Sequence, residues 1–145
     1  MSEYKYDPTS YRSPQRTWSE KQRRFLDEWT YLYYFLLTLP DGREITVEPP
    51  FTYDKGSVIR LLFGWLPRDD KEALIAFLIH DWLYEKQMIG GVWITRKEAD
   101  SILYDLLRHS GMRYTKAKAA YLGVRAGGWA YFNDRAKSIG NTHYL

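Results

Sequence analysis

A run of apolar residues from Ala73 to Ile79 leads directly into His80 and Asp81. A helix with apolar side chains on every face must lie inside the protein, because no face of it suits water. The segment therefore predicts a central buried helix that takes His80 and Asp81 into the interior with it. Buried polar and charged groups cost free energy unless each has a partner. The sequence thus indicates a polar site in the core around these two residues.

Composition is that of an ordinary globular domain. The 145 residues are 45% hydrophobic and 27% charged, which suits a single core. There is no cysteine, so disulfide bonds, thiolate-bound zinc and a cysteine nucleophile are excluded. The first residues lack the profile of a secretory signal, and the apolar stretch over residues 29–39 is too short to span a bilayer. We expect a protein that is made in the cytoplasm and is not transmembrane.

The chain is mildly basic, with a formal net charge of +3 and a pI near 9.0. The densest basic cluster lies near the N-terminus and is interleaved with Tyr11 and Trp18; it consists of Arg12, Arg16, Lys21, Arg23 and Arg24. Basic and aromatic side chains together suit single-stranded nucleic acid. A solvated surface, or one that meets an acidic partner, is the commoner use of such charges. We therefore predict no specific nucleic-acid binding.

The chain divides into an N-terminal arm and one domain. Residues 1–20 are polar and turn-rich, which predicts an extended arm, and residues 21–145 predict a single globular domain. Asp41-Gly42 lies between two apolar runs and predicts a β-hairpin of residues 29–38 and 44–47.

Helices are expected after the hairpin. Capping residues and glycines predict them over residues 58–65, from Asp69 or Asp70 to about Gln87, from Thr95 to Gly111, and over residues 115–131. The predicted fold class is α+β, with an N-terminal β-hairpin or small antiparallel sheet packed on a bundle of three to four helices.

Four residues form the constellation that could carry chemistry: His80, Asp81, Tyr84 and Asp100. Residues four apart share a helix face whereas neighbours point about 100° apart, so His80 and Tyr84 lie together and Asp81 points elsewhere. In a catalytic arrangement His80 would be a general base and Asp100 would hold its other ring nitrogen. Asp81 could then bind a hard cation such as calcium. The alternative is a buried polar pair that ties two helices together without chemistry.

The H-D-W-L-Y segment at residues 80–84 and the A-D-S-I-L segment at residues 99–103 resemble a known active site. They are similar to the H-D-x-x-Y helix and the second helix of secreted phospholipases that cleave the sn-2 acyl ester, and of their parvovirus capsid relatives. The resemblance implies that His80 activates water, Asp81 binds calcium, Asp100 orients His80, and Tyr84 supports Asp100. The chain departs from that family in having no disulfides and no glycine-rich calcium loop before the helix.

A longer resemblance extends from about residue 29 to residue 130. The segments V-x-P-P-F-T-x-D-x-G-S-V, A-x-x-I-H-D-W-L-Y, R-K-E-A-D and Y-x-x-V-R-x-G-G are similar to a family of small bacteriophage and prophage proteins of unknown function. This resemblance implies a phage origin. It also makes Thr52, Asp54 and Ser57 site residues, because their loop precedes the His-Asp helix and is expected to fold over it. We predict Asp54 as a second metal ligand. The other interpretation of this loop is a turn and helix cap.

Two functions remain open on this evidence. The first is a phage-encoded ester hydrolase, assisted by calcium as its one expected cofactor, which acts on lipid of the host envelope during entry or lysis. The second is a non-catalytic virion or tail-associated component whose partners are other virion subunits or further copies of the same chain. Either protein would be made in the host cytoplasm, and the second would be incorporated in the virion.

Overall fold

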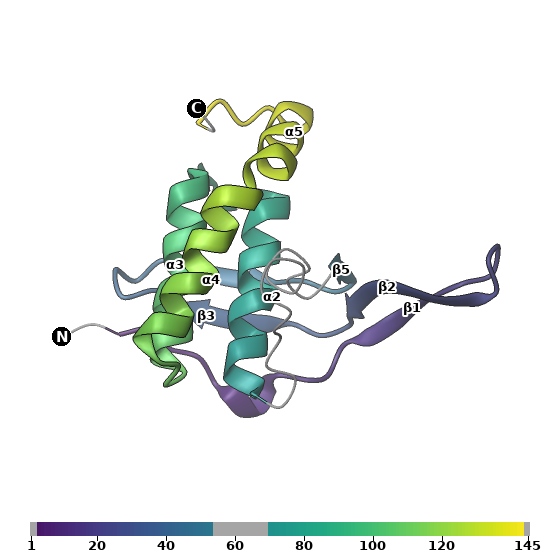
Figure 1. Cartoon of the computed structure of the whole chain (residues 1–145), viewed down its shortest axis with the longest axis horizontal. Helices are drawn as coiled ribbons and strands as arrows, with labels where there is room; N and C mark the ends of the chain where they lie inside the picture. Colours follow the sequence, from purple (N-terminus) through teal and green to yellow (C-terminus); the bar gives the residue numbers. More distant parts are fainter. Residues whose placement is uncertain (1–2, 54–69, 144–145) are drawn as a thin grey trace.

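The computed structural model describes residues 3–53 and 70–143 of the chain. Figure 1 shows three helices side by side in front of short strands, and a further helix that extends from one end of this bundle. The predicted α+β class is confirmed, because small antiparallel sheets pack on a helical body. The helix predicted over residues 58–65 and the loop residues Asp54 and Ser57 lie outside the described residues.

The described strands form three small antiparallel sheets. In the largest sheet, β2 (Arg24–Tyr31) lies between β1 (Gln15–Ser19) and β5 (Phe51–Tyr53). The other two pairs are β3 (Phe35–Thr38) with β4 (Glu44–Val47), and β6 (Met88–Ile89) with β7 (Val92–Trp93). Buried and exposed side chains alternate along β3, β4 and β5, so one face of each strand joins the core.

The predicted hairpin around Asp41-Gly42 is confirmed, but its first strand is shorter than predicted. β3 and β4 meet at a turn in which Gly42 has a φ of +92°, a conformation that favours glycine. The strand predicted over residues 29–38 is divided between two sheets. Residues 29–31 belong to β2 and pair with β5, whereas β3 pairs with β4. The chain therefore crosses from one sheet to the other over residues 32–34.

Helix α2 (Lys71–Lys86) is the buried centre of the body, as the apolar run predicts. Its N-cap is Asp70, whose side chain accepts a hydrogen bond from the backbone N–H of Ala73 at 3.0 Å. Side chains on opposite sides of the helix, such as Ile75 and Phe77, are both buried. The helix contacts α3, α5, β4 and β5, so helices and strands both pack on it.

Helix α3 (Arg96–His109) begins at the predicted cap, where Thr95 Oγ1 accepts a hydrogen bond from the backbone N–H of Glu98 at 3.1 Å. The prediction of a single helix over residues 115–131 is wrong. Helix α4 (Tyr114–Gly127) ends at Gly128, and α5 (Trp129–Ile139) follows at once. Gly128 lies against Tyr84 of α2 at this junction. Within residues 3–53 and 70–143, no helix has the length and apolar character needed to cross a bilayer.

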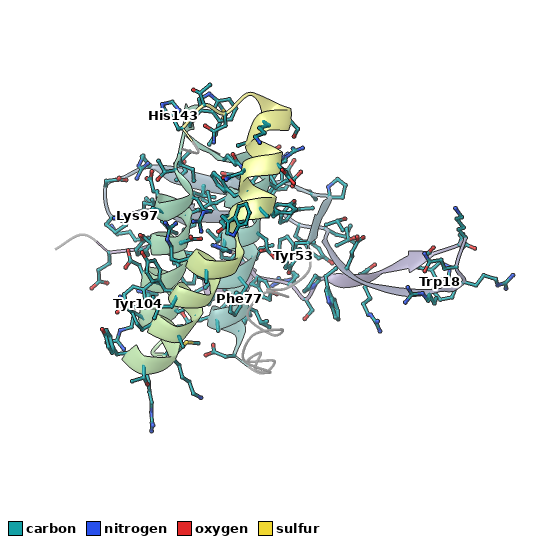
Figure 2. The ribbon with its side chains drawn as sticks, turned by 45° about the horizontal axis from the view of Figure 1, so that its top comes forward. Trp18, Tyr53, Phe77, Lys97, Tyr104 and His143 are labelled. Atoms are coloured by element: carbon teal, nitrogen blue, oxygen red, sulfur yellow. The ribbon has the colours of Figure 1, made fainter. Side chains whose placement is uncertain are left out.

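The N-terminal residues follow the domain before they enter β1. Lys5 and Thr38 exchange two backbone hydrogen bonds, of 2.9 and 2.8 Å, and Tyr11 is buried with its ring stacked on that of Tyr31. Strands β1 and β2 then project away from the body, and Trp18 lies near the far end of this projection (Figures 1 and 2). The division into an arm of residues 1–20 and a domain of residues 21–145 stays a prediction, although Tyr11 is part of the core.

Candidate functional site

One carboxylate, that of Asp100 in α3, organises the site. Asp100 is fully buried, and its Oδ1 accepts hydrogen bonds from Nε2 of His80 at 2.8 Å and from the hydroxyl of Tyr84 at 2.6 Å. His80 and Tyr84 lie one turn apart on α2, so both reach the same oxygen. An ionised carboxylate only accepts hydrogen bonds, so Nε2 carries the hydrogen of this bond. The structure thus brings together His80, Tyr84 and Asp100, the three residues predicted as catalytic.

Two arginines hold the other oxygen of Asp100. Arg96, four residues earlier on α3, approaches Oδ2 at 3.3 Å, and Arg125 of α4 approaches it at 3.0 Å. The guanidinium of Arg96 also donates to the backbone carbonyls of Val124, at 3.2 Å, and Arg125, at 3.0 Å. The cluster therefore connects α2, α3 and the last turn of α4 through charge-assisted hydrogen bonds.

These contacts set the protonation states of the cluster. Burial opposes a charge on His80, but the hydrogen bonds and negative charges of Asp100 and Asp81 outweigh it and raise the pKa of His80 to about 9. Burial likewise opposes ionisation of Asp100, yet the hydrogen bonds and charge of its partners, His80 first among them, lower its pKa. Burial and the charge of Asp100 raise the pKa of Tyr84, so this hydroxyl remains a donor. The ligand-free site at neutral pH therefore pairs an imidazolium with an ionised Asp100.

Asp81 lies on the other side of the imidazole. Its Oδ1 is 3.8 Å from Nδ1 of His80, and its side chain is partly exposed. Asp81 is the one predicted metal ligand within the described residues, because Asp54 lies outside them. In this described part of the chain, no group of three or more His, Cys, Asp or Glu side chains is placed to hold a metal ion. The residues that the structure describes therefore do not make a calcium site by themselves.

Thr52, predicted to lie in a loop over the site, belongs to strand β5. Its neighbours Phe51 and Tyr53 point into the core, and Thr52 points outward, where its hydroxyl lies 3.1 Å from that of Thr30 on β2. A role of Thr52 over the site stays a prediction, as does that of Ser57, which lies outside the described residues.

Gly128 allows Tyr84 to reach Asp100. A Cβ atom built on Gly128 would lie 2.4 Å from the hydroxyl oxygen of Tyr84 and 2.8 Å from the carbonyl oxygen of Val124. Both distances are too short for any larger residue to be accommodated without movement. The backbone at the junction between α4 and α5 is therefore in direct contact with Tyr84, the residue that donates a hydrogen bond to Asp100.

Three residues of this site were not predicted as site residues from the sequence: Arg96, Arg125 and Gly128. Arg96 could have been found, because it lies four residues before Asp100 on a predicted helix and so shares its face. Arg125 and Gly128 are remote from Asp100 and Tyr84 in the sequence, and only the packing of α4 against α3 and α2 brings them there.

Comparison of the chain with protein families, curated proteins and solved structures finds a match to one family. No curated protein and no solved structure matches the chain. A family model described as a protein of unknown function, DUF1353, matches residues 29–124, which is well over half of the chain. The matched region contains His80, Asp81, Tyr84 and Asp100 and ends next to Arg125. The chain therefore belongs to DUF1353, a family of proteins of unknown function.

Proposed function

We propose that the protein is an acyl-ester hydrolase in which His80 is the general base. The observation that carries the proposal is the 2.8 Å hydrogen bond between Nε2 of His80 and Asp100, which leaves Nδ1 as the nitrogen that exchanges a proton with water. Tyr84, Arg96 and Arg125 fix Asp100 in turn, so the imidazole is positioned before a substrate binds.

The chemistry requires His80 to lose and regain one proton. As a water oxygen attacks the carbonyl carbon of the ester, the water gives a proton to Nδ1. The ester C–O bond then breaks, and Nδ1 returns the proton to the leaving alcohol oxygen. Asp100 stays ionised and stabilises the imidazolium. Because the pKa of His80 is about 9 in the free protein, the rate is expected to rise toward alkaline pH as Nδ1 becomes available.

Phospholipid is the proposed substrate class. The resemblance of residues 80–84 and 99–103 to secreted phospholipases supports an acyl ester of a glycerophospholipid. We propose further that the protein is encoded by a bacteriophage and acts on lipid of the host envelope during entry or lysis.

Calcium assistance is a separate part of the proposal. It rests on the carboxylate of Asp81 beside His80, and calcium needs several more oxygen ligands than this one residue offers. No step of the reaction described above uses a metal. Turnover in added calcium, compared with turnover in a chelator, tests this part independently of His80.

The deciding experiment measures fatty-acid release from vesicles of phosphatidylethanolamine and phosphatidylglycerol. Purified wild type is compared with His80→Ala, Asp81→Asn and His109→Ala, with calcium or with a chelator. His109 is a matched control because it is an exposed histidine at the end of α3. We expect turnover by wild type and His109→Ala, and a loss of about 10²-fold or more in His80→Ala. Absence of release by folded wild type under both conditions would contradict the proposal.

A non-catalytic virion or tail component is the second candidate function, and the hydrogen-bond cluster itself favours it. The four hydrogen bonds that Asp100 accepts join α2, α3 and α4, as expected of a cluster whose role is only to hold these helices together. Under this function His80→Ala lowers the melting temperature and wild type cleaves no ester. Under the hydrolase function the same variant stays folded and loses turnover, so thermal unfolding measured beside the vesicle assay separates the two.

A further inference from the structure

Two buried tyrosine hydroxyls have no role in the cluster around Asp100. Tyr53 and Tyr11 are only 7% and 5% exposed, and their two hydroxyls lie close enough to influence each other, although within the described residues neither makes a hydrogen bond of good geometry. Buried hydroxyls are nearly always hydrogen-bonded. Leaving one without a bond costs about 1–3 kcal/mol, so such a group in a native protein calls for an explanation. A ligand oxygen that accepts a hydrogen bond would provide one.

The packing of β5 on α2 brings Tyr53 to the Asp81 side of the site. The rings of Phe51 and Trp82 meet edge to face with centroids 5.1 Å apart, and the ring of Tyr53 stacks on Phe51 at 5.5 Å. Trp82 follows Asp81 directly in α2. Figure 2 shows Tyr53 between the helical body and the base of the projecting strands. Tyr53 thus approaches α2 next to Asp81, whereas Asp100 contacts His80 from α3.

Electrostatics distinguish Tyr53 from the tyrosines around it. Burial, then the neighbouring hydroxyl of Tyr11, and then the negative charge of Asp81 raise the pKa of Tyr53, so its hydroxyl keeps its proton and remains a hydrogen-bond donor. Burial also raises the pKa of Tyr11, to about 12, with Tyr53 and Tyr31 as its neighbours. Tyr84 already donates to Asp100, and the hydroxyl of Tyr31 accepts from the backbone N–H of Arg12 at 3.3 Å. Tyr53 therefore combines a hydroxyl that makes no hydrogen bond of good geometry with a position close enough to Asp81 to be affected by its charge.

We propose that the hydroxyl of Tyr53 binds the carbonyl oxygen of the ester as water attacks it. This inference rests on the proposed hydrolase function and adds a catalytic residue to it. The water oxygen forms a bond to the carbonyl carbon, the π electrons move onto the carbonyl oxygen, and this oxyanion accepts a hydrogen bond from Tyr53. The proton released by water goes to Nδ1 of His80.

When the intermediate collapses, the C=O bond forms again, the ester C–O bond breaks, and the alkoxide takes the proton from His80. Tyr53 keeps its own proton throughout. A donor fixed in a site shielded from bulk solvent stabilises an oxyanion strongly, because no reorganisation is needed at the moment of reaction. Both hydroxyls are covered in the ligand-free protein, so the groups that cover them must move when an ester enters.

The test compares Tyr53→Phe with Tyr31→Phe. The second variant removes a buried hydroxyl from the same aromatic cluster, but one that bonds to the backbone of Arg12 instead of facing the site. Loss of one oxyanion donor is expected to lower kcat by about 10²–10³-fold, with KM and the midpoint of the pH profile unchanged. The melting temperature of Tyr53→Phe is expected to stay close to that of wild type, since the variant loses no hydrogen bond of good geometry and only the contact with the hydroxyl of Tyr11. Unchanged kcat in Tyr53→Phe, or a loss of turnover that merely follows a loss of stability, would overturn the inference.

A binding measurement keeps this inference separate from the hydrolase proposal. A long-chain alkyl methylphosphonate is titrated into wild type and both variants by calorimetry, because its anionic oxygens resemble the oxyanion. We expect binding to wild type and Tyr31→Phe and a loss of about 10²-fold in affinity in Tyr53→Phe. This result would support the role of Tyr53 even if no tested ester is cleaved. No binding by wild type, or equal binding by all three proteins, would overturn it.

Discussion

At the scale of single residues, the main feature of the site is that the carboxylate of Asp100 accepts several hydrogen bonds. Asp100 has no exposed surface, and it receives hydrogen bonds from an imidazole, a phenol and two guanidinium groups. An isolated buried carboxylate would take up a proton, and these partners keep it ionised. His80 in turn lies between Asp100 and Asp81, which is why it holds a proton that an ordinary histidine would lose near neutrality.

Stability should therefore depend on pH through His80. The pKa of His80 is about 9 in the folded protein against an ordinary value of 6.5, so the folded state binds the proton more tightly. Its contribution is fully present below pH 6.5 and is lost as pH rises through 9, by an amount on the order of 3 kcal/mol. Urea unfolding of wild type and His80→Gln from pH 6 to pH 10 measures this as a difference between the two proteins. Parallel curves for the two proteins would show that His80 does not bind its proton as described.

At the scale of secondary-structure elements, the junction of α4 and α5 sets the position of Tyr84. Gly128→Ala would place a methyl group against the hydroxyl of Tyr84 and the carbonyl of Val124. We expect a loss of about 1–3 kcal/mol of stability, because one of these groups must move. The double variant Gly128→Ala with Tyr84→Phe should lose less than the sum of its parts, since the nearest clashing atom is absent. Chemical denaturation measures the free energy of unfolding of each variant, and losses that add exactly in the double variant would contradict this expectation. The control is Gly127→Ala, at the exposed neighbouring position.

The elements also show which parts of the molecule the sequence could predict. Asp70 and Thr95 are caps that act within one turn, and both helices begin where these residues predict. The site pair His80 and Asp100 was predictable because each lies on a helix whose buried face the sequence defines. In contrast, the crossing between sheets at residues 32–34 depends on a partner strand at residues 51–53, which no local pattern reveals.

Gln87, at the end of α2, is another residue whose structural role the sequence could not predict. The sequence predicts only that the helix ends near it. In the structure Gln87 is fully buried with a φ of +57°, and its side chain donates to the carbonyl of Phe132 at 2.9 Å and accepts from Asn141 at 2.7 Å. Both partners come from the C-terminal part of the chain, so a polar residue becomes a core residue through contacts that arise only in the folded molecule.

At the scale of the whole molecule, the N-terminal residues help to close the core. Tyr11 is buried, and the hydroxyls of Tyr4 and Tyr6 donate to Asp105 and Glu72 on the helices. A chain that begins at Arg12 should therefore lose about 3 kcal/mol or more of stability, since burial of one large side chain alone is worth about 1.5–3 kcal/mol. Trp18→Ser, in the projecting strands, should change the melting temperature little. Thermal unfolding of both proteins checks this, and a fully stable truncated chain would place these tyrosines outside the cooperative core.

The pH dependence of kcat/KM shows whether His80 is the general base. The profile of vesicle hydrolysis from pH 6 to pH 10 is compared with the titration of the His80 ring followed by NMR in the same protein. We expect activity to rise with a midpoint that coincides with the loss of the His80 proton, near pH 9, and we expect Asp81→Asn to lower both midpoints together. A rate that is independent of the ionisation of His80 would contradict it.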